Sequence, residues 1–136
     1  MSPEQLLGSV DFQDQVVVAD FEAGIGTLTR MGDDRLVDVI LVVVEPTVKS
    51  IEVGTRAVAV ASEKGLGRVI VVANRIRDGA ASLSIAEAFG GVEVVEVPDD
   101  DALAEAERRG VAPLDAAPDS PAVRALMALA GSLAPA

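Results

Sequence analysis

Four short apolar runs, each closed by charged or turn-forming residues, stand out along the chain. Runs of this length that are rich in Val and Ile predict β-strands. The second and third are nearly continuous in Val, Ile and Leu, which is typical of parallel strands covered on both faces. The fourth alternates Val with Glu, so we expect it nearer a sheet edge. In order, the four are Gln15–Phe21, Val37–Pro46, Gly67–Ile76 and Val92–Pro98.

Helical patterns lie between and after these strands. Apolar residues recur there at helical spacing, and glycine or Ser-Pro marks several of the ends. Strands that alternate with helices predict parallel βαβ units with right-handed crossovers. We therefore expect an α/β fold, with a mostly parallel sheet of about four strands and flanking helices, forming one domain over residues 1–136. The expected helices are Thr47–Lys64, Ser84–Phe89, Asp100–Arg109 and Ser120–Leu133.

Charge and composition narrow the range of functions. The chain has 136 residues, with 22 acidic against 11 basic side chains and a formal net charge of -11. Such a field repels a phosphate backbone, so nucleic acid is not an expected partner. The sequence has no Cys and no His, which excludes thiol chemistry, zinc-finger sites and Ser-His-Asp triads. Oxygen ligands remain, and these suit Mg²⁺.

The sequence contains neither a secretory signal pattern nor an apolar run of membrane-spanning length. Both features have recognisable compositions, so their absence favours a cytoplasmic location. We therefore expect no membrane partner.

The ends of the four expected strands carry the candidate chemistry. In open parallel sheets, ligands bind beyond the carboxyl ends of the strands. Asp20 could hold a Mg²⁺-bound water, Gly24 would let a backbone amide approach a phosphate, and Asn74 could pair with the edge of a base. The alternative is structural, because strand ends are often polar simply where they meet water.

A set of motifs in these positions resembles a known family. The segments are VVVADFEAGIGTLTR, ILVVVEPTVKS, VIVVANRI and VPDDDALAEAERRGVAPLDAAPDSPAVRAL. In this order and spacing they resemble the C-terminal half of the MinD/ParA-type P-loop ATPases. The branch that they resemble most is the CooC-like one, whose members act in the maturation of carbon monoxide dehydrogenase. The resemblance covers nearly the whole chain and implies half of a Rossmann-like layered P-loop domain.

The resemblance also implies roles for individual residues. Asp20 would be the Walker B-type aspartate that acts on the Mg²⁺ shell, and the turn that follows it would sense the terminal phosphate. Residues 45–47 would lie near the face where two ATP-bound subunits meet. Asn74 would contact the adenine edge. The implied nucleotide-binding residues are Glu22, Ala23, Gly24, Asn74, Arg75, Pro98 and Asp99.

One part of the family pattern is missing from this sequence. The phosphate-binding loop, G-x-x-x-x-G-K-[ST], does not occur, and the two lysines, Lys49 and Lys64, do not follow a glycine. Backbone amides and the lysine of that loop hold the phosphates, so we expect ATP, ADP and Mg²⁺ to bind this chain alone weakly or not at all. Hydrolysis by the chain alone is not expected, because phosphoryl transfer depends on that electrostatic cradle.

Several interpretations remain open. The chain could be a half-domain that joins a P-loop-bearing partner chain, or a homo-oligomer, in a nucleotide-dependent dimeric switch with a metalloenzyme as client. It could instead be a degenerate, non-catalytic binding or scaffold module that needs a partner chain. It could also be the later part of a longer protein whose P-loop lies upstream. A receiver-like or flavodoxin-like module fits least, because Asn74-Arg75 stands where a receiver domain has a lysine.

Overall fold

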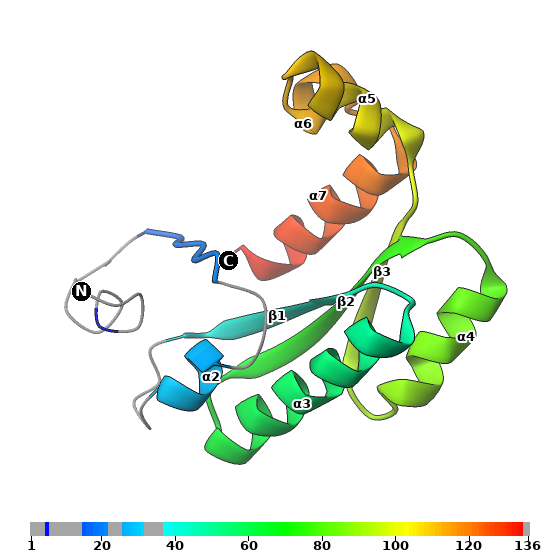
Figure 1. Cartoon of the computed structure of the whole chain (residues 1–136). Coiled ribbons are helices and arrows are strands. Elements are labelled where there is room, and N and C mark those ends of the chain that lie inside the picture. The colour runs from blue at the N-terminus through cyan, green and yellow to red at the C-terminus, as the bar shows by residue number, and fades with distance from the viewer. Residues whose placement is uncertain (1–4, 6–14, 22–25, 32–36, 135–136) are drawn as a thin grey trace.

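A three-stranded parallel sheet forms the centre of the molecule (Figure 1). The computed structural model describes residues 5, 15–21, 26–31 and 37–134. The strand order is β1-β2-β3, so β2 is the central strand. The strands are β1 Val39–Val44, β2 Arg68–Ile76 and β3 Glu93–Pro98. Fold class and strand direction are therefore as the sequence predicts.

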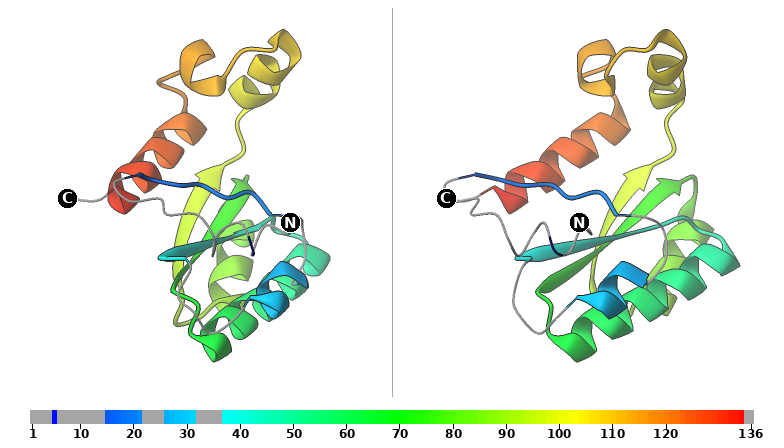
Figure 2. Two further views of the ribbon diagram at one scale, coloured as in Figure 1. Left: turned by 90° about the vertical axis from the view of Figure 1, so that its left-hand side faces the viewer. Right: turned by 60° about the vertical axis from the view of Figure 1, so that its left-hand side comes forward.

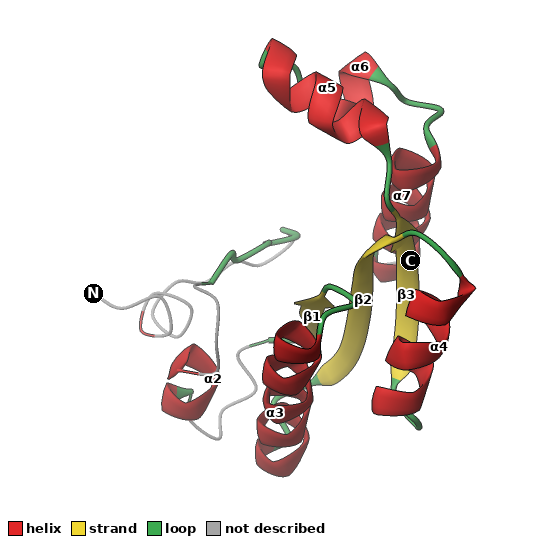
Figure 3. Ribbon diagram, turned by 45° about the vertical axis from the view of Figure 1, so that its right-hand side comes forward, coloured by secondary structure: helices red, strands yellow, loops and turns green. Residues whose placement is uncertain are grey.

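Helices cover the two faces of the sheet unequally. Figure 3 shows α3 and α4 on one face, with α7 behind the sheet on the other. The short helices α5 and α6 lie beyond the end of the sheet (Figure 1). The bounds are α2 Gly26–Arg30, α3 Val48–Lys64, α4 Gly79–Ala88, α5 Asp101–Arg109, α6 Pro113–Ala116 and α7 Pro121–Leu133.

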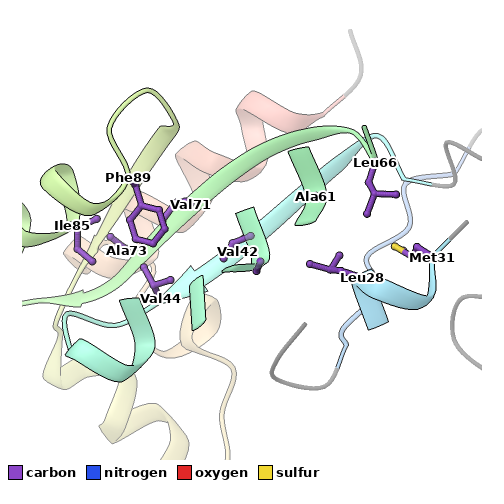
Figure 4. Packing of buried hydrophobic residues seen from close by; sticks show 11 residues of the cluster. Leu28, Met31, Val42, Val44, Ala61, Leu66, Val71, Ala73, Ile85 and Phe89 are labelled. Atoms are coloured by element: carbon purple, nitrogen blue, oxygen red, sulfur yellow. The ribbon is translucent and has the colours of Figure 1, made fainter. Parts of the chain in front are cut away.

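The larger core lies between the sheet and helices α3 and α4 (Figure 4). Val44 and Phe89 meet at one end of it, and Leu28 closes the other. Helix α3 can approach the sheet closely because Gly54 faces it: a Cβ there would lie 2.4 Å from Val44 Cγ1 and 3.1 Å from Phe89 Cζ. The glycine is therefore a packing requirement, not a helix-breaking signal.

A second core lies on the opposite face, between the sheet and α7. Its buried members come from β2, β3 and α7, and they are Ile70, Val72, Val97, Ala122 and Leu129. Strand β2 consequently contributes to both cores, with four consecutive buried residues from Ile70 to Ala73. This agrees with the prediction that a continuous apolar run is covered on both faces.

The prediction that a continuous apolar run is covered on both faces is wrong for β1. Val42 and Val44 are buried, but Leu41 is 41% exposed and Val43 is 62% exposed. Helix α7 packs chiefly along β3, so it does not extend over these side chains. Strand β1 is an edge strand among the described residues, and its outward face is apolar.

The first expected strand, Gln15–Phe21, is also a wrong prediction. The segment is present as irregular chain that pairs with no described strand, and Figure 2 draws it as a loop on the β1 side of the sheet. Val16 is 71% exposed and Val18 is 88% exposed. Its composition favours a strand, but a strand forms only where a neighbour supplies ladder hydrogen bonds.

The helix boundaries largely match the sequence signals. Thr47 caps α3, accepting the N–H of Ser50 at 3.2 Å, and Gly65 ends the helix in the left-handed conformation with φ 61°. Helix α4 begins five residues earlier than Ser84, because Asp78 caps it by accepting the N–H of Ala81 at 2.8 Å. Helices α2 and α6 were not expected.

Asp100 joins two helices that lie far apart in the sequence. One carboxylate oxygen accepts the N–H of Ala102 at 2.9 Å, which caps α5, and the other accepts the N–H of Ala122 at 3.0 Å, at the start of α7. These bonds favour the ionised form, so they lower the pKa of Asp100 below its usual value, with the Ala122 bond the larger cause. One carboxylate therefore fixes the relative placement of both helix starts.

We predict that Gly54→Ala destabilises the fold by about 1–3 kcal/mol, although alanine is the better helix former. The added methyl would collide with Val44 and Phe89, which are both buried. Gly131→Ala in α7 is the matched control, because nothing lies within 4 Å of its added Cβ. That variant should gain up to about 1 kcal/mol. Urea denaturation of both variants measures the two effects, and a stabilised Gly54→Ala protein would contradict the close approach.

We also predict that Asp100→Asn lowers the melting temperature at neutral pH. In this variant the melting temperature should also decrease less as the pH is lowered. The lowered pKa means that the carboxylate stabilises the fold above about pH 3.9 and that this contribution is lost as the pH falls through the folded-state pKa. An asparagine has one accepting oxygen, so it can serve only one of the two N–H groups.

Asp101→Asn is the control for this prediction, because Asp101 is an exposed acid in the first turn of the same helix. Melting curves from pH 2 to pH 7 compare the two variants. Equal curves would show that the link from Asp100 to Ala122 contributes nothing to stability.

Candidate functional site

The carboxyl ends of the three strands meet in a cluster of charged side chains. Arg75, near the end of β2, lies between Glu45 after β1 and Asp99 after β3. Its Nη1 is 3.6 Å from Glu45 Oε1 and its Nε is 3.3 Å from Asp99 Oδ1. Arg77 Nε approaches the other Asp99 oxygen at 2.8 Å. The sequence-predicted pair Arg75 and Asp99 is thus brought together.

A bulge near the end of β2 orients this cluster. The register with β3 shifts between Ala73 and Ile76, and Arg75 has the left-handed φ of 59°. A non-glycine residue in this region is strained, and such strain persists only where the surroundings hold it. The N–H of Asp99 donates to the carbonyl of Ile76 at 3.0 Å, which ties the two strand ends together below the ion pairs.

The two arginines set the charge state of Asp99. The Arg77 hydrogen bond is the largest cause that lowers the pKa of this carboxyl, and Arg75 contributes less. In turn, the hydrogen bond to Asp99 is the first cause of the raised pKa of Arg75. Asp99 is therefore ionised at neutral pH, and the cluster is an anchored network rather than a proton donor or acceptor.

Asn74 is half-buried at the same bulge, one residue before the strained arginine. Within the described part of the chain, its side-chain amide has no hydrogen-bond partner. Pro98, also half-buried, ends the neighbouring strand. A half-buried amide offers one acceptor and two donors, a combination that can pair with the edge of a planar heterocycle.

A separate groove of about 910 Å³ runs along the free edge of β1. One wall is the segment from Val18 to Phe21, and the other is β1 from Ile40 to Val43. Helix α3 and residues of α2 close its base. The polar residues that line the groove are Asp20, Thr27, Thr47, Lys49 and Ser50, of which Lys49 and Ser50 belong to the first turn of α3.

Asp20 and Thr47, which follows β1, both line this groove. Both are exposed. The expected phosphate-sensing residues Glu22, Ala23 and Gly24 lie outside the described residues. No group of three or more Asp or Glu side chains in the described ranges is placed to hold a metal ion.

The positions of the two lysines bear on phosphate binding. Lys64 donates to the carbonyls of Thr29 and Met31 at 2.7 and 2.8 Å, so it fastens α3 to the end of α2. Lys49, in the first turn of α3, is exposed and lines the groove. The described residues thus include an unpaired half-buried amide at Asn74 and an exposed carboxylate at Asp20, but no lysine held by a glycine-rich loop.

Arg77 is a site residue that sequence analysis missed. Its partner Asp99 is 22 positions away in the chain, so the contact depends on how two strand ends are aligned. The only local signal is the spacing of Arg75 and Arg77 across Ile76, and in a regular strand that spacing would place both on one face.

Comparisons with known proteins support part of the family resemblance. No family model matches the chain. The chain is 35% identical over 101 residues to a protein of Methanocaldococcus jannaschii described as uncharacterized ATP-binding protein MJ0823, and 28% identical over 133 residues to uncharacterized ATP-binding protein MJ0547 of the same organism. These matches cover 72% and 96% of the chain but only 39% and 50% of the two relatives.

The fold is similar to that of the MinD cell division protein of Aquifex aeolicus. The match has a TM-score of 0.58 at 24% identity and covers 74% of this chain and 47% of that protein. The chain therefore has a MinD-like α/β fold and spans about half the length of the proteins that it resembles. Within the described residues, no helix combines the length and apolarity needed to cross a membrane.

We predict that Arg77→Gln raises the pKa of Asp99 more than Arg75→Gln does, since the Arg77 bond is the larger cause of its lowering. In both variants the value should move toward the ordinary one of about 3.9. Because a lowered pKa stabilises the fold only above that ordinary value, both variants should also lose less stability in acid.

Carboxyl-carbon NMR titration of Asp99 from pH 2 to pH 6 measures the shift directly. Arg124→Gln, an exposed arginine of α7 with no part in the cluster, is the control. A larger rise of the Asp99 pKa in Arg75→Gln than in Arg77→Gln would contradict the prediction that the Arg77 hydrogen bond is the larger cause of its lowering.

Proposed function

We propose that this chain is one half of a MinD/ParA-like ATP-binding unit, the half that contacts the adenine base and the Mg²⁺ ion. We propose further that it works with a polypeptide that carries the P-loop. The observation that carries the proposal is the half-buried amide of Asn74, which has no partner in the described residues and lies at the carboxyl end of the central strand. Ligands of open parallel sheets bind beyond these ends. The ATP-binding descriptions of the two relatives support the choice of ligand.

The proposed roles follow from the position of each residue. Asn74 would accept from and donate to the adenine edge, and Pro98 would cover the ring. Arg75 and Asp99 would hold the bulge in place through the ion pair between them. Asp20 would hold a Mg²⁺-bound water, and the metal would neutralise phosphate charge when bound.

The phosphates need a contribution that these residues do not make. The sequence has no glycine-rich loop with a lysine, and Lys64 is engaged in joining two helices. Base-edge contacts alone correspond to a dissociation constant in the millimolar range or weaker, about 4 kcal/mol. The chain alone would therefore bind ATP weakly and would not hydrolyse it.

The finer assignment follows from the motif pattern. A CooC-like, cytoplasmic role in metalloenzyme maturation, as a nucleotide-dependent dimeric switch, rests on the order of D-x-E-A-G, E-P-T and V-x-N-R along the chain. The second candidate is a non-catalytic binding module. It is favoured by one specific observation, the apolar outer face of β1, which suits protein contact whether or not nucleotide binds.

We predict that MgATP at 1 to 10 mM shifts the side-chain NH₂ resonances of Asn74 and the backbone amides around residues 75 and 99, with a dissociation constant of about 1 mM or more. The experiment is an NMR titration of the ¹⁵N-labelled chain. Inorganic pyrophosphate with Mg²⁺ should leave Asn74 unshifted, because it has no base.

Asn74→Ala should remove the response to MgATP. Asp38→Ala is the control, because Asp38 is an exposed carboxylate at the opposite end of β1. No shift at Asn74 up to 10 mM would leave the non-catalytic module as the better reading. Binding tighter than about 100 µM would show that the chain grips phosphate by itself, against the need for a P-loop.

A further inference from the structure

Acidic side chains are unevenly distributed along the chain. The segment from Asp78 to Glu107, which includes α4, β3 and most of α5, has nine acidic side chains and no basic one. Arg68, at the start of β2, neutralises Glu93 through an ion pair of 2.7 Å. Glu87 and Glu96 are exposed and have no ion-pair partner in the described part of the chain. The surface along α4 and β3 therefore carries uncompensated negative charge.

A groove of about 480 Å³ lies between α4 and β3, which run side by side in Figure 3. Ala86 and Phe89 belong to its helical wall, and Val94 and Glu96 belong to its strand wall. Alternate residues of a strand share one face, so Val94 and Glu96 both lie on the face that α4 covers. Among the described residues that line the groove, the only other polar side chain is that of Ser82. The groove is therefore largely apolar, with one carboxylate on its strand wall.

Strand β3 has a free edge beside this groove. It pairs with β2 on one side and with no described strand on the other. The backbone N–H and C=O groups on the free side therefore lack ladder partners in the described residues, and an added strand would supply them. The turn at Gly90 and Gly91 leaves one end of the groove open, since an added Cβ at Gly91 would have no atom within 4 Å. An extended segment can enter there and continue along β3.

The charge of this edge decides which kind of segment can pair with it. Glu93 and Glu96 are both exposed on β3. A second copy of the chain would bring the same two acids to the interface, so like charges would oppose the pairing of two β3 edges. Side chains directly opposite one another in paired strands lie within about 5 Å, which is close enough for a Lys or Arg to compensate Glu96. A basic segment therefore gains from the same charge that disfavours a second copy.

We propose that the groove between α4 and β3 binds an extended, basic segment of another protein. The segment pairs with the free edge of β3 as an added strand, places apolar side chains against Ala86 and Val94, and places a Lys or Arg beside Glu96. This inference goes beyond the proposed function and does not rest on it, because no residue that lines this groove is a proposed nucleotide contact.

The test is an NMR titration of the ¹⁵N-labelled chain with a model peptide of alternating lysine and valine, acetyl-KVKVKV-amide. We expect the backbone amides of β3 and of Gly90 and Gly91 to shift, with a dissociation constant of about 1 mM or less. The charge-reversed peptide acetyl-EVEVEV-amide is the control, and it should cause no shift at the same concentration. Raising the salt concentration from about 20 mM to about 500 mM should weaken binding of the basic peptide about fivefold or more.

Two pairs of variants locate the site. Glu96→Gln should weaken binding of the basic peptide about threefold or more, whereas Glu107→Gln should leave it unchanged, because Glu107 is an exposed acid of the same acidic segment that does not line the groove. Ala86→Gln should block the groove and abolish binding. Its control is Ala88→Gln, since Ala88 is an exposed alanine of the same helix outside the lining. Unchanged amide resonances of β2 show that a variant keeps the fold.

Several results would overturn the proposal. These are equal binding of the basic and acidic peptides, binding that does not respond to salt, shifts that leave β3 and its glycine turn unaffected, equal effects within either pair of variants, and no shift up to about 5 mM peptide. Shifts at β3 that depend on the concentration of the chain without any peptide would identify a second copy as the occupant, and would also overturn it.

Discussion

A parallel sheet must be covered on both faces and paired along its strands, and among the strands of the described residues only β2 satisfies the whole requirement. It contributes Ile70 and Val72 to one core and Val71 and Ala73 to the other, with β1 and β3 hydrogen-bonded on either side. The helices are arranged around that strand. Asn74, near its carboxyl end, is positioned by this strand.

The same rigidity allows strain near the strand's end. The bulge after Ala73 and the left-handed Arg75 would relax in a loosely held loop, but here ion pairs to Glu45 and Asp99 fix the guanidinium from both neighbouring strands. The half-buried Asn74 lies inside the interval where the register of β2 with β3 shifts. The proposed adenine contact thus lies at a local irregularity in an otherwise well-paired strand.

Much of the fold could be predicted from sequence because its signals are local. The continuous apolar run of β2, the Val/Glu alternation of β3, and the glycines and acids at helix ends all act within a few residues. Three features could not be predicted, because they depend on distant partners: the Asp100 bond to Ala122, the Arg77 contact with Asp99, and the failure of residues 15–21 to pair. Among candidate site residues, Asn74, Arg75, Pro98 and Asp99 do gather at one edge, since parallel strands bring their ends together.

The failed strand also bears on how the site could work. A carboxylate acts on a metal-bound water only when its position is fixed to a fraction of an ångström. Asp20 lies on a segment with no ladder hydrogen bonds in the described structure, whereas Asn74 lies on the best-supported strand. The proposed base-edge contact at Asn74 is therefore preorganised, whereas the proposed metal-side carboxylate of Asp20 is not.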